Sequence, residues 1–309
     1  MKLSASGVSG ANTDGMMRSV KAGRIVHAVL LTGPRGTGKR TSARLAAQAL
    51  LCTGANPPCG ACPECKQFLA GSHPDVHTIS TDARSISVEE IRALRDELAM
   101  RPFEGGRHVA IIQQADKMTA QAQNALLKTL EEPIGDVVFF IITDQPGAML
   151  PTIVSRCQRI RFSPLNMDEC TQELEKRGID PARARLLAGA SQGSVGRALE
   201  IDAAEGYFEL RDRVLSSLKQ LQKGRGAVAS AAAQLEDKKE STADILEIME
   251  VAARDLMAAQ NGAEPYTDVT GIGLDGRRLL LTVMELRRLM AGNVSWVGAL
   301  EWAFLGLVK

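Results

Sequence analysis

The stretch HAVLLTGPRGTGKRTS, residues 27–42, decides the fold of this chain. It reads as a short apolar strand, a glycine-rich turn and the start of an alanine-rich helix. In a P-loop, glycines let backbone N–H groups converge on phosphate oxygens at a helix N-terminus, and a lysine reaches the terminal phosphates. Gly33, Gly36, Gly38 and Lys39 occupy those positions. We therefore predict a phosphate-binding loop between a buried strand and a helix.

The residue after the P-loop lysine departs from the pattern. It is usually Ser or Thr, because that hydroxyl completes the magnesium shell. This chain has Arg40 there and Thr41 one position later. The phosphate cradle is therefore complete in sequence, whereas one metal ligand is replaced. A strand-to-helix turn that binds no nucleotide remains the alternative interpretation.

Composition limits the class of protein. The chain has 309 residues and 45% hydrophobic content, enough for a core in two or three units. A formal net charge of +1 does not indicate a strongly basic nucleic-acid binder. Without a signal-peptide-like stretch or a run long enough to span a bilayer, we expect a soluble cytoplasmic protein. Its six cysteines are then expected to be thiols or metal ligands.

Strands alternate with helices through residues 1–163, which predicts an α/β domain with a parallel sheet covered on both faces. Ser87 and Glu90 form a capping-box pattern ahead of a helix that runs to about residue 100. A short helix is expected over residues 16–22. Further strands are predicted at Val76–Ser80, His108–Ile112, Val137–Thr143 and Gln158–Phe162.

No strands are predicted after Ser163. Residues 164–205 read as a small helical unit, and residues 206–309 as the helices of a bundle with apolar faces. Ser241 and Asp244 fit a second capping box there. We therefore expect three domains, at residues 1–163, 164–205 and 206–309.

Four cysteines follow the P-loop helix with the spacing C-x6-C-x2-C-x2-C. They are Cys52, Cys59, Cys62 and Cys65. Each C-x2-C step turns two thiolates onto one ion, and four thiolates close a tetrahedral zinc site with no open position for chemistry. We predict a structural zinc knuckle that uses neither His73 nor His77 as a ligand. Four unligated thiols or a redox C-x2-C pair are the alternatives.

Several motifs together resemble the AAA+ clamp-loader subunits of bacterial DNA polymerase III, and the delta-prime subunits more closely than gamma/tau. The resemblance runs from about Gly23 to Ile201. It implies a nucleotide-binding module, a helical lid and a collar that holds the subunits in a ring, which loads a sliding clamp onto primed DNA. The motifs are HAVLLTGPRGTGK, the cysteine knuckle, HPDVH, ADKMTAQAQNALLKTLEEP, ITD, IVSRCQRIRF and GSVGRAL.

The departures from this family indicate a degenerate ATP site. Active members end the strand matching His108–Ile112 in Asp-Glu, for magnesium and for the attacking water. This chain has Gln113 and Gln114, and a neutral amide cannot accept a proton near neutral pH. The family's lid helix carries the pattern G-S-x-R, and this chain has Gly193-Ser194-Val195-Gly196 there. Arg197 follows one position after the expected arginine, which rotates its side chain by about 100° around the helix axis. We expect no ATPase activity from this chain, and nucleotide binding through Mg²⁺ is left in doubt.

The resemblance also implies two further site residues. Arg156 of the SRC motif is expected to act in trans, completing the ATP site of a neighbouring subunit, and Thr143 of the ITD motif joins the nucleotide-binding candidates. An ordinary surface contact is the alternative for Arg156. Two other functions stay open: an active gamma-like ATPase using Thr41 with Asp116 or Asp144 for magnesium, and a zinc-knuckle nucleic-acid binder with a relic P-loop.

Overall fold

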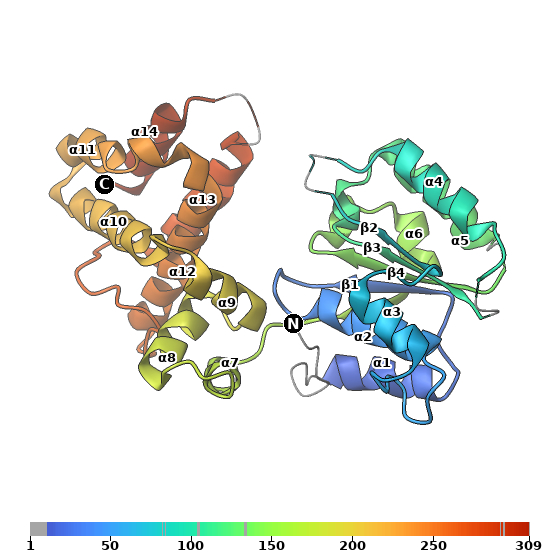
Figure 1. Cartoon of the computed structure of the whole chain (residues 1–309). Coiled ribbons are helices and arrows are strands. Elements are labelled where there is room, and N and C mark those ends of the chain that lie inside the picture. The colour runs from blue at the N-terminus through green and yellow to red at the C-terminus, as the bar shows by residue number, and fades with distance from the viewer. Residues whose placement is uncertain are drawn as a thin grey trace. The chain divides into compact units, whose positions relative to one another are not determined.

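The computed structural model describes residues 11–308 except positions 82, 84, 104, 105, 133, 134, 291 and 293. Residues 1–10, which the first predicted domain includes, lie outside the described part. The chain divides into two compact units, Met1–Pro164 and Leu165–Lys309 (Figure 1). Each unit is described by itself. None of the helices in the described residues is both long and apolar enough to cross a membrane.

A parallel sheet forms the centre of the first unit, which confirms the predicted α/β class. The strand order is β2-β3-β4-β1-β5, and every pair is parallel. The middle strands β1, β3 and β4 are buried along their whole length, as their continuous apolar runs predict. The strands are β1 Ala28–Thr32, β2 Val76–Ile79, β3 His108–Ile112, β4 Val137–Thr143 and β5 Gln158–Arg161.

Helices cover both faces of this sheet (Figure 1). Successive side chains of a strand point to opposite faces, so Leu30 of β1 joins one apolar core and Leu31 joins the other. The core containing Leu30 is closed by α4, α5 and α6, and the core containing Leu31 by α1, α2 and α3. Their bounds are α1 Ala11–Lys21, α2 Lys39–Leu51, α3 Pro63–Ala70, α4 Val88–Leu98, α5 Ala120–Glu131 and α6 Pro151–Arg156.

Local sequence signals place most of these helices correctly. Ser87 and Glu90 make the predicted capping box at the start of α4. The helix expected at residues 16–22 is longer than predicted, because α1 begins at Ala11. Met16 and Val20 of α1 are buried against the sheet. Tertiary packing therefore extends a helix whose Gly- and Ser-rich flank has little helical propensity of its own.

The second unit is all helical in its described part. One continuous apolar core runs through it, from Cys170 to Val308. The predicted division at residue 205 stays a prediction. The helices are α7 Met167–Glu175, α8 Pro181–Ala190, α9 Val195–Ala203, α10 Tyr207–Gln220, α11 Val228–Ala233, α12 Thr242–Gln260, α13 Gly276–Met290 and α14 Trp296–Leu307.

The capping box predicted at Ser241 and Asp244 is wrong. Ser241 precedes α12 but makes no side-chain cap hydrogen bond. Asp244 instead accepts a hydrogen bond from the Arg197 guanidinium at 2.5 Å. The Asp244 carboxylate is thus bound by a cation from another helix, in a hydrogen bond between two ionised groups.

Candidate functional site

The glycine-rich loop turns from β1 into α2 with the geometry that its glycines require. Gly33 has a φ of 140°, and a Cβ there would lie 2.0 Å from the carbonyl oxygen of Phe162. Gly36 and Gly38 also have positive φ, at 76° and 89°. Residues that carry a Cβ rarely adopt such positive φ angles, so the loop needs glycine at these positions. Backbone N–H groups at the start of α2 are thereby left for an anion to approach.

Lys39 folds back onto the loop instead of extending from it. Its Nζ donates to the carbonyl oxygens of Gly33 at 2.7 Å and Pro34 at 2.6 Å. Asp144, directly after β4, forms an ion pair with the same atom at 2.8 Å. The lysine side chain is only 4% exposed.

The carboxyl end of β3 carries the two glutamines. Gln113 is buried there, while Gln114 is exposed and takes a left-handed backbone with a φ of 50°. Beside them, Thr143 donates its hydroxyl hydrogen to Asp116 at 2.8 Å. Thr41 is half-buried in the first turn of α2. The hydroxyl of Thr143, a predicted nucleotide-binding residue, is therefore used within the chain, with Asp116 as its acceptor.

Positive charge follows the lysine along α2. Arg40 is exposed, and Arg44 one turn later lies over the Phe68 ring at 5.2 Å. Burial, together with the nearby Arg40 charge, lowers the pKa of Arg44 from its usual value. The position that normally carries a magnesium ligand thus carries a cation, which repels a metal ion.

The lid arginine is bound to carboxylates within the second unit. Arg197, in α9, donates to Glu247 at 2.7 Å and to Asp244 on α12, and its side chain is 16% exposed. Although burial lowers the pKa of Arg197, hydrogen bonds and charge from Glu247 and Asp244 raise it overall. This guanidinium is therefore held by neighbouring acidic groups of its own unit.

Arg156 is the last residue of α6 and remains accessible. Its side chain is 39% exposed. Its guanidinium forms an ion pair with Glu131 of α5 at 2.5 Å and donates to the Thr152 carbonyl oxygen at 3.2 Å. Burial raises the pKa of the adjoining Cys157 thiol to about 11, so that cysteine stays protonated near neutral pH. An exposed ion pair of this kind is weak enough to exchange partners.

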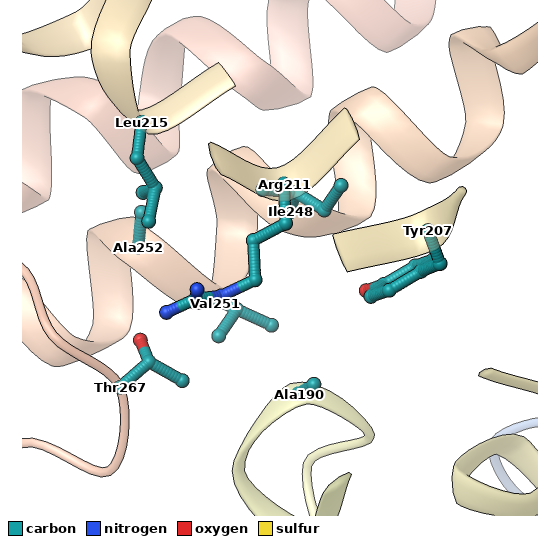
Figure 2. A pocket seen from close by; sticks show the side chains of 8 residues that line it. All are labelled: Ala190, Tyr207, Arg211, Leu215, Ile248, Val251, Ala252 and Thr267. Carbon is teal, nitrogen blue, oxygen red and sulfur yellow. The ribbon is translucent and has the colours of Figure 1, made fainter. Parts of the chain in front are cut away.

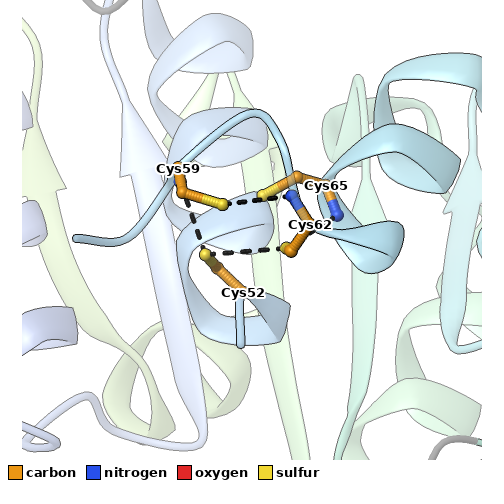
Figure 3. A group of neighbouring side chains, drawn as sticks. All are labelled: Cys52, Cys59, Cys62 and Cys65. Carbon is orange, nitrogen blue, oxygen red and sulfur yellow. Dashed lines mark hydrogen bonds between the residues drawn. The ribbon is translucent and has the colours of Figure 1, made fainter. Parts of the chain in front are cut away.

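The four predicted zinc ligands come together at the junction of α2 and α3 (Figure 3). Cys52 is the C-cap of α2, and Cys62 is the N-cap of α3. All four Sγ atoms lie within 4.8 Å of one another. The Sγ atoms of Cys52 and Cys62 are 3.9 Å apart. Tetrahedral zinc with Zn–S bonds of about 2.3 Å needs an edge of about 3.8 Å, so these residues fit a metal such as zinc.

Backbone N–H groups also stabilise thiolates in this cluster. The amides of Ala61 and Cys62 donate to the Cys59 Sγ at 3.4 and 3.3 Å. These bonds lower the pKa of Cys59 to about 6, whereas burial raises the pKa of Cys65 to about 12. A bound cation favours the deprotonated form of every ligand, so it offsets the cost at Cys65. His73 is not a member of this four-cysteine group, and its Nδ1 accepts a hydrogen bond from the Asp75 amide.

Two hollows lie outside these sites. One, in the second unit between α10, α12 and Thr267, has a volume of about 10 Å³ (Figure 2). That is room for one water molecule at most, so it is not a ligand pocket. The other, of about 430 Å³, lies between α1 and the edge strand β5.

The Lys39–Asp144 pair is not among the predictions from the sequence, which treat Asp144 only as a candidate magnesium ligand. Its pairing with Lys39 depends on strand register. The parallel pairing of Thr32 with Thr143 brings Asp144 to the start of the loop. Two observations could have suggested it: a carboxylate directly after a predicted central strand, and the meeting of parallel strand ends at one edge of a sheet.

Known proteins are similar in sequence to at least half of this chain. A family model described as "DNA polymerase III, delta subunit" matches residues 11–166. The DNA polymerase III delta-prime subunit of Bacillus subtilis is 37% identical over 212 residues, which cover 68% of this chain and 64% of that protein. The tau subunit of Escherichia coli is 35% identical over 194 residues, covering 60% of this chain and 30% of that one. The matched region is thus under two thirds of either relative.

A solved structure of a DNA polymerase III gamma-subunit-related protein from Thermotoga maritima also aligns with the chain. The alignment covers 95% of this chain and 97% of the other, with a TM-score of 0.49 and 16% sequence identity.

Proposed function

Because the chain belongs to the DNA polymerase III delta-prime family, which is related to the gamma and tau clamp-loader subunits, we propose that it is a clamp-loader subunit that does not hydrolyse ATP itself. Its partners are the other loader subunits, and through them the sliding clamp and primed DNA. In this role residues 1–163 are the AAA+ module, residues 164–205 the lid and residues 206–309 the collar.

The observation that carries this proposal is the pair of glutamines at the end of β3. Phosphoryl transfer needs negative charge to hold magnesium and a group to position or deprotonate the attacking water. Gln113 and Gln114 are neutral amides, which can hold a water but can neither balance the magnesium charge nor accept a proton near neutral pH. The carboxylates considered as substitutes have other partners, since Asp116 accepts from Thr143 and Asp144 pairs with Lys39.

The lid supports the same conclusion. Gly196 takes the place where active relatives present an arginine to the terminal phosphate, and it has no side chain to do so. Arg197 is paired with Asp244 and Glu247 of α12. Removing a buried charge from its partners is costly, so this guanidinium is a poor substitute for a phosphate-binding arginine.

We expect the isolated chain to turn over ATP at least a thousandfold more slowly than an ordinary ATPase, whose rate is about 1 s⁻¹ or more. Phosphate release from the purified protein measures this. Gln113→Asp with Gln114→Glu is not expected to create activity, because Arg40 and Gly196 remain as separate defects. Ordinary turnover that Lys39→Ala abolishes would instead establish the gamma-like ATPase.

The nucleic-acid-binding alternative is tested separately. A zinc-knuckle protein that binds DNA on its own should show an affinity that falls steeply as salt rises, through release of counterions from the phosphates. With a net charge of +1, the isolated chain is expected to bind a primed DNA weakly and without such a slope. A salt-dependent DNA titration of the isolated chain decides between the two.

Apolar side chains on the last two helices support the collar assignment. Leu281 and Met284 of α13 and Trp302 and Leu305 of α14 are large and roughly half exposed or more. Helices α13 and α14 pack against each other within the second unit. Large exposed apolar side chains gathered on neighbouring elements are typical of protein–protein interfaces.

Met284→Arg with Trp302→Arg is expected to weaken assembly with the ATPase subunits at least tenfold, since both would bury a charge without a partner. Both side chains are well exposed, at 62% and 49%, so the thermal midpoint should change little. Analytical ultracentrifugation of the mixed subunits measures the effect. Leu69→Arg, at an apolar position of the first unit that is 42% exposed, is the control. Equal assembly of the double variant and wild type would place the interface elsewhere.

A further inference from the structure

The three protons of the P-loop lysine are all used within the chain. A lysine ammonium has three N–H donors and no acceptor. The Nζ of Lys39 lies 2.7 Å from the Gly33 oxygen, 2.6 Å from the Pro34 oxygen and 2.8 Å from Asp144 Oδ1. With its donors occupied and its side chain 4% exposed, Lys39 has none left for a phosphate.

Asp144 is built into this position by the sheet. Strand β4 pairs with β1 so that Thr143 lies beside Thr32, the residue before Gly33. The next residue of β4 therefore emerges beside the first residue of the loop. The Asp144 carboxylate is 43% exposed, so its cost of desolvation is small and it can pair with Lys39 without other support.

We propose that Asp144 is an internal competitor for nucleotide phosphate, holding Lys39 in a closed P-loop. The inference rests on the proposed non-hydrolysing function, and it adds a mechanism by which the loop opposes nucleotide binding. An incoming phosphate must displace the carboxylate from Lys39 and then lie close to a second negative charge. Like charges separated by a few ångströms repel strongly at the edge of a protein, so the carboxylate opposes phosphate twice.

The other charged groups around the loop favour anions. Arg40 is exposed in the first turn of α2, and Arg44 follows one turn later. Arg159 of β5 donates its Nε–H to the Thr32 hydroxyl at 3.3 Å, so a third guanidinium lies beside the end of β1. Asp116 binds the Thr143 hydroxyl. Removing the Asp144 charge should thus leave a basic loop with the phosphate-binding backbone of a P-loop.

The test is ADP binding, measured by isothermal titration calorimetry on the full chain with EDTA present, so that magnesium does not contribute. Asp144→Asn is expected to bind ADP at least tenfold more tightly than wild type. Adding Lys39→Ala to that variant should remove the gain, because the freed lysine is its source. Asp136 directly precedes β4 and pairs with Arg107, so Asp136→Asn removes a carboxylate away from the loop. This control variant should bind ADP as tightly as wild type does.

A second measurement does not depend on nucleotide. Acetylation of Lys39 by an amine reagent, followed by mass spectrometry, should be slow in wild type and several-fold faster in Asp144→Asn, because the ion pair that covers the amine is gone. Each variant is first checked for a wild-type thermal midpoint. If Asp144→Asn misfolds, Asp144→Ala takes its place in both measurements.

Three outcomes would overturn the proposal. These are unchanged ADP affinity in Asp144→Asn, an equal gain in the variant that also lacks Lys39, and wild-type affinity already matching that of ordinary P-loop proteins. Assembly with the ATPase subunits is measured on the same samples. Failure to assemble contradicts the proposed function, whereas intact assembly with unchanged ADP affinity contradicts only the role of Asp144.

Discussion

Arg156→Ala is expected to lower ATP hydrolysis at the neighbouring subunit's site by about a thousandfold or more, while this chain still folds and assembles. In the transition state, negative charge spreads over the oxygens of the transferred phosphoryl group. A guanidinium presents fixed donors to those oxygens, and its charge does not titrate. In the proposed role this arginine completes a single neighbouring site, so the assembled ring should lose a fraction of its total ATPase and a larger share of clamp loading.

The structure shows what Arg156 must leave in order to act in trans. Its side chain is exposed and pairs with Glu131, which is itself 41% exposed. Exposed ion pairs contribute about 0–1 kcal/mol, so exchanging Glu131 for a phosphate of the neighbouring subunit has a small cost. Glu131→Gln should therefore leave the ring's ATPase at or slightly above the wild-type rate.

The experiment is reconstitution with active ATPase subunits, a clamp and primed DNA. Arg156→Lys should rescue poorly, since an ammonium does not reproduce the planar fork of donors. Arg107→Ala is the matched control, because Arg107 also forms a partly exposed ion pair, with Asp136. If hydrolysis and loading are unchanged in Arg156→Ala with assembly confirmed, the arginine has only a surface role.

How much of the fold was predictable depended on the kind of signal. The bounds of β3 and β4 agree with prediction, because a fully buried parallel strand is a continuous apolar run bounded by polar residues. The start of α1 was missed, since residues 11–15 have low helical propensity and are held by tertiary contacts. One such contact joins Thr13 to the buried Ser42 of α2 at 2.6 Å.

Side-chain partners were harder to predict than backbone elements. The four cysteines were found from spacing because their ligand geometry is local. The partner of Lys39 lies 105 positions away in the chain and is brought there by strand register. Arg197 lies one residue after the arginine position of the lid pattern in the sequence, whereas its pairing with α12 depends on the packing of two helices. Long-range electrostatic partners of this kind depend on strand register and helix packing, which a single sequence indicates only indirectly.

Cys62→Ser is expected to abolish binding of a zinc ion that contributes about 10 kcal/mol or more to local folding. The loop of residues 52–65 contributes no side chain to the buried members of either core, so we expect metal coordination to be its main source of stability. Removing one thiolate breaks the closed tetrahedral set. The loop should become sensitive to proteases, while the sheet and its helices keep their thermal transition, because the knuckle is an insertion that follows α2 and ends in the first turn of α3.

Elemental analysis of protein purified without chelator measures the zinc content, with one ion per chain expected for wild type and none for Cys62→Ser. Cys157→Ser also removes one thiol from the first unit, but outside the cluster, and should keep the zinc. A wild-type protein without zinc would show that the cysteines are unligated thiols. Substitution of His73 should leave the zinc in place, since the four cysteine Sγ atoms form a complete tetrahedral set without it.

Zinc retention should also depend on pH in a defined direction. Ligand thiols must be deprotonated, so falling pH makes protons compete with the metal. Backbone hydrogen bonds lower the pKa of the Cys59 thiol to about 6, so in the metal-free site this ligand stays largely ionised above pH 6 and is protonated below it. The pKa of this thiol is therefore lower in the folded chain than in the unfolded chain. The stability that the Cys59 thiolate contributes to the folded loop is fully present above the unfolded-state pKa, and it is lost as pH falls through about 6. Zinc should be released progressively on acidification, and metal titration that shows release as pH rises from neutral would contradict thiolate coordination.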